Sequence, residues 1–149
     1  MAIKSFRGKI ADGGIDTLTL HTNDGSTGYR IIKFQIITDE PYGGGNSEHV
    51  MKIFKIPQTA PYTELTVDFS DNTLLGISTI NNAASGYNYA SVPVIIFDRE
   101  IFNQDIYITH TDGQGTNACN YYIELEQIKL DLGENTVATL KDIRNIASQ

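Results

Sequence analysis

The sequence predicts an all-β protein, and residue composition, periodicity and turn chemistry all support this class. Of the 149 residues, 40 are Ile, Thr or Val, whereas Ala and Leu occur only nine times each. Branching at Cβ restricts side-chain rotamers in helices and suits the pleated surface of a sheet. Apolar and polar residues alternate in short segments separated by Gly, Asn, Asp and Pro. We therefore expect one domain over residues 1–149, an antiparallel, jelly-roll-like β-sandwich of about eight to nine strands with one C-terminal helix.

Four segments in the first 60 residues have the periodicity of half-buried strands. In the third of them, the alternation predicts that Ile32, Phe34 and Ile36 point inward. The fourth stops at Pro57, which has no N–H to donate to a sheet. The predicted strands are residues 2–10, 16–22, 28–38 and 49–56.

Five further segments complete the predicted series. In the first of them, Leu65, Val67 and Phe69 share one face, opposite polar neighbours. The third is apolar on both faces, which is typical of a central strand. The predicted strands are residues 63–69, 73–80, 92–98, 104–111 and 119–131.

The last part of the chain has helical periodicity. Apolar residues, among them Leu140 and Ile143, recur every three positions, and Asn135 is suited to cap a first helical turn. This pattern predicts a helix at about residues 136–147, lying along the sheet or against an adjacent subunit. Leu140 and Ile143 are therefore candidate interface residues.

Three tyrosines occur in the two longest predicted loops. Tyr42 lies in a glycine-rich loop at 39–48, and Tyr87 and Tyr89 lie in a polar loop at 81–91. Tyrosine offers a large contact area at low entropic cost and is enriched at protein interfaces. We treat all three as candidate interface residues, with packing back over a sheet end as the alternative.

Residue types that often carry chemistry form no recognisable motif. No spacing unites His21, His49 and His110, which we expect to be solvent-facing strand residues. Cys119, the single cysteine, is expected to be a small buried residue. Residues 113–118 match the outline GxGxxA of a dinucleotide fingerprint, but a strand pattern follows where that fingerprint needs a helix. We expect a hairpin loop there.

The acidic residues likewise point to structure rather than to a reaction. Asp68 and Asp71 are the nearest approach to a calcium-binding pair, and turn capping explains them equally well. Glu124 and Glu126 share one strand face, which we expect to be solvated. The sequence therefore predicts no catalytic residue, no cofactor and no metal, and a protein that is not an enzyme.

Charge and hydropathy limit the classes of partner that we expect for this protein. The chain has 11 basic and 18 acidic residues and a net charge of -7, which disfavours nucleic acid as a ligand. Residues 1–60 carry a net charge of +1 and residues 61–149 carry -8. The N-terminus has no apolar signal-peptide core, and no apolar run approaches the length of a membrane span. We expect a soluble protein made in a reducing compartment, with no membrane partner.

The segment from Asn120 to Asn145 resembles the tails of small virion structural proteins from marine tailed bacteriophages. The likeness is strongest from Glu124-Leu-Glu-Gln127 through Thr139-Leu-Lys-Asp-Ile-Arg-Asn145. Accessory capsid proteins of this type often use jelly rolls or related sandwiches. The resemblance supplies no active-site residue.

The resemblance implies a capsid decoration, or cement, protein that binds and stabilises the assembled phage head. Its partner is then the major capsid protein or another virion protein, and the resemblance favours a homo-oligomer, in particular a trimer. Its location is the virion, after synthesis in the host cytoplasm. The alternative is a tail-associated or host-surface carbohydrate-binding β-sandwich, in which loop tyrosines stack on sugars with or without calcium.

Overall fold

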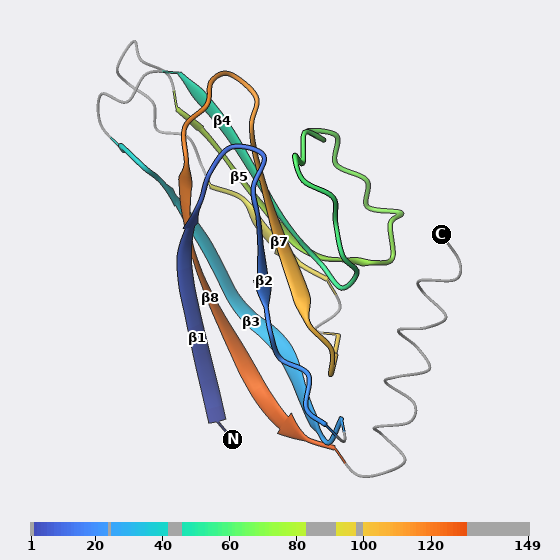
Figure 1. Cartoon of the computed structure of the whole chain (residues 1–149). Helices are drawn as coiled ribbons and strands as arrows, with labels where there is room; N and C mark the ends of the chain where they lie inside the picture. Colours follow the sequence, from blue (N-terminus) through green and yellow to red (C-terminus); the bar gives the residue numbers. More distant parts are fainter. Residues whose placement is uncertain (1, 24, 42–45, 83–91, 98–99, 131–149) are drawn as a thin grey trace.

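Two antiparallel sheets pack face to face in the computed structural model, which describes residues 2–23, 25–41, 46–82, 92–97 and 100–130 (Figure 1). The predicted β-sandwich is confirmed. In these described residues no helix has the length and apolar character needed to cross a bilayer. The predicted helix at 136–147 lies outside the described residues.

The smaller sheet has three strands in the order β1-β8-β3, so the last of the described strands lies between two early strands. Its strands are β1 (Ala2–Ile10), β8 (Cys119–Lys129) and β3 (Thr27–Thr38). The larger sheet has the order β2-β7-β4-β5-β6. Its strands are β2 (Ile15–Leu18), β7 (Ile106–Asp112), β4 (Ser47–Phe54), β5 (Leu74–Asn82) and β6 (Val94–Ile96).

The core lies between the two sheets and is built from alternate residues of the central strands. Strands β4, β7 and β8 each contribute side chains with no solvent exposure, because a side chain that points between the sheets is covered on all sides. These fully buried apolar residues are Met51, Ile53, Ile106, Ile108, Ile123 and Leu125.

A β-bulge in β3 reverses the prediction for Ile32. Ile31 pairs with Leu125 and Lys33 pairs with Glu124, so Ile32 is the extra residue of the bulge. The extra residue changes the phase of the alternation. Ile31 is therefore buried and Ile32 is exposed, whereas Phe34 and Ile36, beyond the bulge, point inward as predicted.

Residues 63–69 do not form a strand, so that prediction was wrong. The apolar side chains of Leu65, Val67 and Phe69 are all exposed. Two backbone carbonyls of this segment, those of Glu64 and Thr66, accept hydrogen bonds from the ammonium of Lys52 on the outer surface of the five-stranded sheet. The segment crosses this surface as an irregular cover (Figure 1). Apolar and polar residues alternate in this segment, but its backbone pairs with no neighbouring strand.

The segment 92–98 contains a strand, but it is not the central strand that its apolar character predicted. Only Val94–Ile96 pairs, and it pairs with β5 at the edge of the five-stranded sheet. Val94 and Ile95 are exposed there. The other predicted strands are present with boundaries shifted by a few residues. Residues 113–118 form a loop as predicted, but the prediction of a hairpin was wrong, because this loop joins β7 of one sheet to β8 of the other.

Candidate functional site

None of the predicted interface residues can be placed. Tyr42, Tyr87, Tyr89, Leu140 and Ile143 all lie outside the described residues. Two other features of the described chain have the character of functional sites. One is an exposed sheet face rich in cations, and the other is a buried cluster of two histidines and a cysteine.

The exposed feature is the outward side of the sheet β1-β8-β3. Residues of β8 that are buried alternate with Asn120, Tyr122, Glu124 and Glu126, which point outward. The strand register places a residue of β1 and a residue of β3 beside each of them. We call this surface the basic face, and its outward residues from β1 and β3 include Ile3, Arg7, Lys9, Arg30, Lys33 and Ile37.

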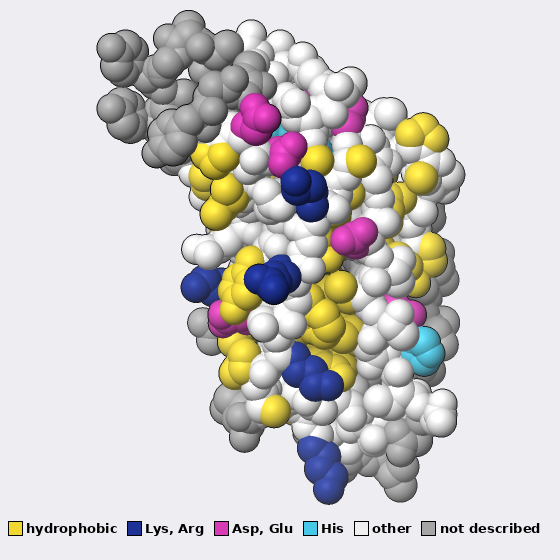
Figure 2. All heavy atoms as spheres, turned by 60° about the vertical axis from the view of Figure 1, so that its left-hand side comes forward, with side chains coloured by type: hydrophobic (Ala, Val, Ile, Leu, Met, Phe, Trp, Pro, Cys, Tyr) yellow, Lys and Arg dark blue, Asp and Glu magenta, His cyan; other side chains and the backbone are white. Residues whose placement is uncertain are grey.

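Exposed positive charge is concentrated on this sheet. Of the described lysines and arginines outside its three strands, Lys52 and Lys55 are both buried. The three strands contain six cations and two carboxylates, a net charge of +4, so the rest of the sequence carries -11. Figure 2 shows the dark blue cationic side chains spread over one side of the molecule. Among the described residues, exposed positive charge therefore lies on this one sheet, and the charged side chains outside it are mainly carboxylates.

Apolar side chains lie among these cations. Ile3 is 51% exposed and Ile37 is 60% exposed, at opposite ends of the face. Ile32, at the bulge, borders a hollow of about 350 Å³ that Arg30 and Glu126 also line. Figure 2 shows yellow hydrophobic surface between the cations. A surface that combines exposed isoleucines with cations has the composition of a protein-binding patch.

Some charges on the basic face are already compensated. The Arg30 guanidinium donates two hydrogen bonds to the Glu126 carboxylate, at 2.9 and 3.1 Å. Lys9 lies 2.6 Å from Asp39, and the Tyr122 hydroxyl donates to Glu124. The prediction that Glu124 and Glu126 form a solvated face was therefore wrong for Glu126, which is buried beside its arginine.

The second feature lies inside the sandwich, where His49 and His110 are in direct contact. Strands β4 and β7 are neighbours, and each directs its histidine toward the core. The two rings are stacked with centroids 5.0 Å apart, and Nδ1 of His49 lies 2.8 Å from Nε2 of His110. Both side chains are buried, so the prediction that they face solvent was wrong. His21 is exposed as predicted, and its Nδ1 lies 2.6 Å from Asp105.

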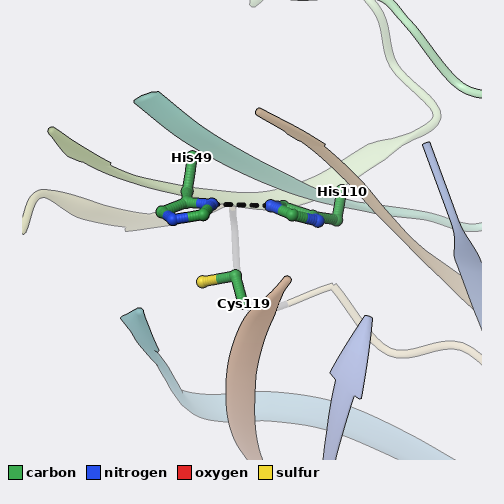
Figure 3. A group of neighbouring side chains, drawn as sticks. All are labelled: His49, His110 and Cys119. Atoms are coloured by element: carbon green, nitrogen blue, oxygen red, sulfur yellow. Dashed lines mark hydrogen bonds between the residues drawn. The ribbon is translucent and has the colours of Figure 1, made fainter. Parts of the chain in front are cut away.

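Cys119 approaches this histidine pair from the opposite sheet. It is the first residue of β8, and its side chain points inward between Ile10 and Thr38, its partners on β1 and β3. The donor atoms of Cys119, His49 and His110 all lie within 4.8 Å of one another. Figure 3 shows the thiol on one side of the pair of imidazoles. Burial of Cys119 was correctly predicted.

The hydrogen bonds assign a proton position to each ring. Nδ1 of His110 lies 3.1 Å from the carbonyl oxygen of Ala11, which only accepts, so this nitrogen carries the proton and donates. Nε2 of a neutral His110 is then an acceptor for the Nδ1–H of His49. This leaves Nε2 of His49 as a bare lone pair, and that atom is buried without a hydrogen-bond partner.

The surroundings favour uncharged histidines and a protonated thiol. Burial is the main cause that lowers the pKa of both His49 and His110. Burial also raises the pKa of Cys119 to about 12. Asp112 opposes the effect on the histidines by raising their pKa values, but it does not outweigh burial.

Sequence reasoning missed this cluster because its members come from three strands, and these strands belong to two different sheets. His49 and His110 are 61 positions apart, and only the pairing of β4 with β7 brings them together. A usable indication was present in the pattern. Both histidines continue the inward-facing alternation of apolar strands, where a solvated histidine does not belong.

The aspartates weighed as a calcium pair act as turn caps. Asp68 accepts hydrogen bonds from the backbone and hydroxyl of Ser70, and Asp71 does the same for Thr73. These local bonds explain both carboxylates.

In comparisons with known proteins, no family model, no curated protein and no solved structure matches this chain.

Proposed function

We propose that this protein is a non-enzymatic structural component of a phage virion, a decoration or cement protein that binds the assembled head through the basic face. The observation that carries the proposal concerns the described residues: their exposed cations lie on the sheet β1-β8-β3, and the charged side chains outside this sheet are mainly carboxylates. The resemblance of the segment Asn120–Asn145 to virion proteins supports it independently of charge.

The charge pattern specifies the chemistry of the partner. A surface that presents Arg7 and Lys33 next to exposed isoleucines complements an acidic surface with apolar patches. We therefore assign the basic face to an acidic surface of the major capsid protein. Stabilisation follows mass action, because a protein that binds assembled subunits in preference to free ones shifts the equilibrium toward assembly.

The location of the chain tests the proposal. Purified particles of the phage that encodes the protein are labelled with a gold-conjugated antibody against it and imaged by electron microscopy. Labels on heads are the expected result. Labels confined to tails overturn the head assignment in favour of the tail-associated alternative, and particles that lack the chain overturn both.

A charge-reversal pair tests the surface. Arg7→Glu changes the net charge by -2 on the basic face. The double variant Thr17→Glu/Thr19→Glu makes the same change at two exposed positions, one in β2 of the other sheet and one directly after β2. We expect Arg7→Glu to weaken binding to heads stripped of this protein by at least about tenfold, with little effect of the control. Added salt weakens wild-type binding, because exposed charges are screened. Equal binding by both variants contradicts the assignment of the face.

The trimer implied by the resemblance belongs to the same proposal. Sedimentation equilibrium of the purified chain measures its mass directly, and a mass of three chains is the expected result. A monomeric mass, found for a chain that still binds heads, contradicts the trimer but not the assignment of the basic face.

A further inference from the structure

We propose that His49, His110 and Cys119 form a binding site for a transition-metal ion, with Zn²⁺ as the ion that the donors suit best. Two imidazoles and one thiol are a borderline-soft donor set, which zinc prefers and which calcium and magnesium do not. The site joins the two sheets, because the histidines come from β4 and β7 and the cysteine from β8.

The spacing of the donors is close to that of a metal site. Zinc bonds of about 2.0–2.3 Å in tetrahedral geometry place donor atoms about 3.3–3.7 Å apart. The three donor atoms here lie within 4.8 Å of one another. Side-chain movements of about 1 Å bring them to that spacing, and rotation about side-chain torsions supplies movements of this size without a change in the strands.

An unused buried lone pair is the second observation that points to a ligand. Nε2 of His49 has no hydrogen-bond partner although it is buried, and a buried acceptor without a partner is costly. The hydroxyl of Thr38, the β3 partner of Cys119, is also buried without a hydrogen-bond partner. Coordination uses the lone pair on Nε2 of His49. It also replaces the His49–His110 hydrogen bond, because Nε2 of His110, which accepts that bond, becomes a ligand. Thr38 provides a polar neighbour for a water molecule at the fourth position of the ion.

An outer shell for the site is already in place. Nδ1 of His110 donates to the carbonyl of Ala11, which is the kind of contact that orients zinc-binding histidines. Asp112 follows His110 by two positions, and its carboxylate accepts backbone hydrogen bonds from Gln114, Gly115 and Asn117. These bonds fix the loop that leads into Cys119.

The charge balance of binding is favourable. Zn²⁺ takes the place of the thiol proton, so one proton leaves to solvent for each ion bound and the zinc–thiolate unit carries a charge of +1. Asp112 and Asp12 are near enough to act electrostatically on both histidines, and the backbone N–H of Asp112 donates to Asp12. Their negative charge compensates the bound ion.

Metal titration of the purified full-length chain tests the site. The protein is reduced, treated with EDTA, freed of chelator and titrated with Co²⁺, whose thiolate complexes absorb strongly through sulfur-to-metal charge transfer. We expect one Co²⁺ per chain with a charge-transfer band, and displacement of the band by one equivalent of Zn²⁺. Zinc binding should release one proton per ion and raise the thermal midpoint.

Two variants locate the bound ion. Cys119→Ala should abolish the charge-transfer band and weaken Zn²⁺ binding by more than about tenfold, since the loss of an outer-shell partner alone costs that much. His21→Ala removes an exposed histidine outside the site and should leave both unchanged. The wild-type protein alone decides the outcome if Cys119→Ala does not fold. Three results contradict the proposal: Co²⁺ binding without a charge-transfer band, loss of binding in His21→Ala, and the absence of stoichiometric binding. Any of them shows that the histidine pair is only a hydrogen-bonded part of the core.

Discussion

The ammonium of Lys52 lies 2.6 Å from the carbonyl oxygen of Thr66, so a side chain of β4 binds the segment that crosses its own sheet. The same group donates to the carbonyl of Glu64 and to the hydroxyl of Tyr62, both at 3.2 Å. Burial lowers the pKa of Lys52, and three oxygens compensate its charge. Lys52 therefore holds the middle of the segment 57–73 over the outer surface of the five-stranded sheet, and backbone bonds from Tyr62 to Gly13 and from Lys55 to Thr73 hold it on either side.

Replacing Lys52 with methionine should release this cover while the sandwich stays folded. We expect faster amide hydrogen exchange in residues 57–73 and a fall of about 1–3 kcal/mol in the free energy of unfolding, because hydrogen bonds to a charged group are lost. Mass spectrometry after exchange measures the local effect. Lys129→Met, at an exposed lysine, is the control. Uniform exchange changes over the whole chain contradict the assigned role.

Acidification should destabilise the metal-free protein between about pH 6.5 and about pH 5, before carboxylates titrate. The pKa values of His49 and His110 are lowered below 6.5 in the folded state, so the unfolded chain binds more protons in this range. The neutral histidines therefore make their full contribution to the free energy of unfolding above about pH 6.5, and this contribution is lost as the pH falls below that value. The slope is at most about 1.4 kcal/mol per pH unit for each histidine.

Urea unfolding at a series of pH values, with EDTA present, measures this slope. His49→Gln should reduce it, because one of the two buried histidines no longer titrates. A wild-type slope near zero over this range shows that the buried histidines accept protons without a cost to folding.

Adding a methyl group at Gly8 should destabilise the protein. A Cβ there lies 2.9 Å from the Tyr121 hydroxyl, which donates to Asp16 across the two sheets. Gly8→Ala should cost about 1–3 kcal/mol, because the tyrosine has to move. A Cβ at Gly115 meets only ordinary contacts, so Gly115→Ala is the control. Thermal unfolding of Gly8→Ala and of Gly8→Ala/Tyr121→Phe checks the cause, since removal of the hydroxyl should restore part of the loss.

Asp112 should control access to Cys119. Its carboxylate accepts backbone hydrogen bonds from Glu48 and from three residues of the β7–β8 loop, so Asp112→Ala leaves these groups without their partner. We expect a loss of at least about 2 kcal/mol in unfolding free energy and a measurable rate of thiol modification by a chromogenic disulfide reagent. Asp68→Ala, at an exposed turn, should leave the thiol unreactive. An inert thiol in Asp112→Ala contradicts this role of the loop.

The alternation rule predicted burial wherever strands are regular. Phe34 and Ile36 are buried, as expected. The rule failed at Ile32, because one extra residue in β3 exchanges inward and outward positions, and two adjacent isoleucines do not reveal which of them forms the bulge. It failed at 63–69 because periodicity reports side-chain chemistry, whereas a strand also needs a backbone partner.

The candidate sites were less accessible to sequence reasoning than the fold. Charge counts over the two parts of the chain showed a slight basic excess in residues 1–60. They did not reveal the basic face, because this face is continuous only when β8 lies between β1 and β3 in the sheet. The contact between His49 and His110 depends on the register of β4 against β7, which the sequence does not encode locally.

The complete burial of Cys119 also governs covalent chemistry between copies of the chain. Since it is the only cysteine, two native molecules cannot be crosslinked by air oxidation while the sandwich is intact. A disulfide-linked species on a non-reducing gel therefore records molecules that have unfolded, and the gel becomes a simple measure of a preparation's history.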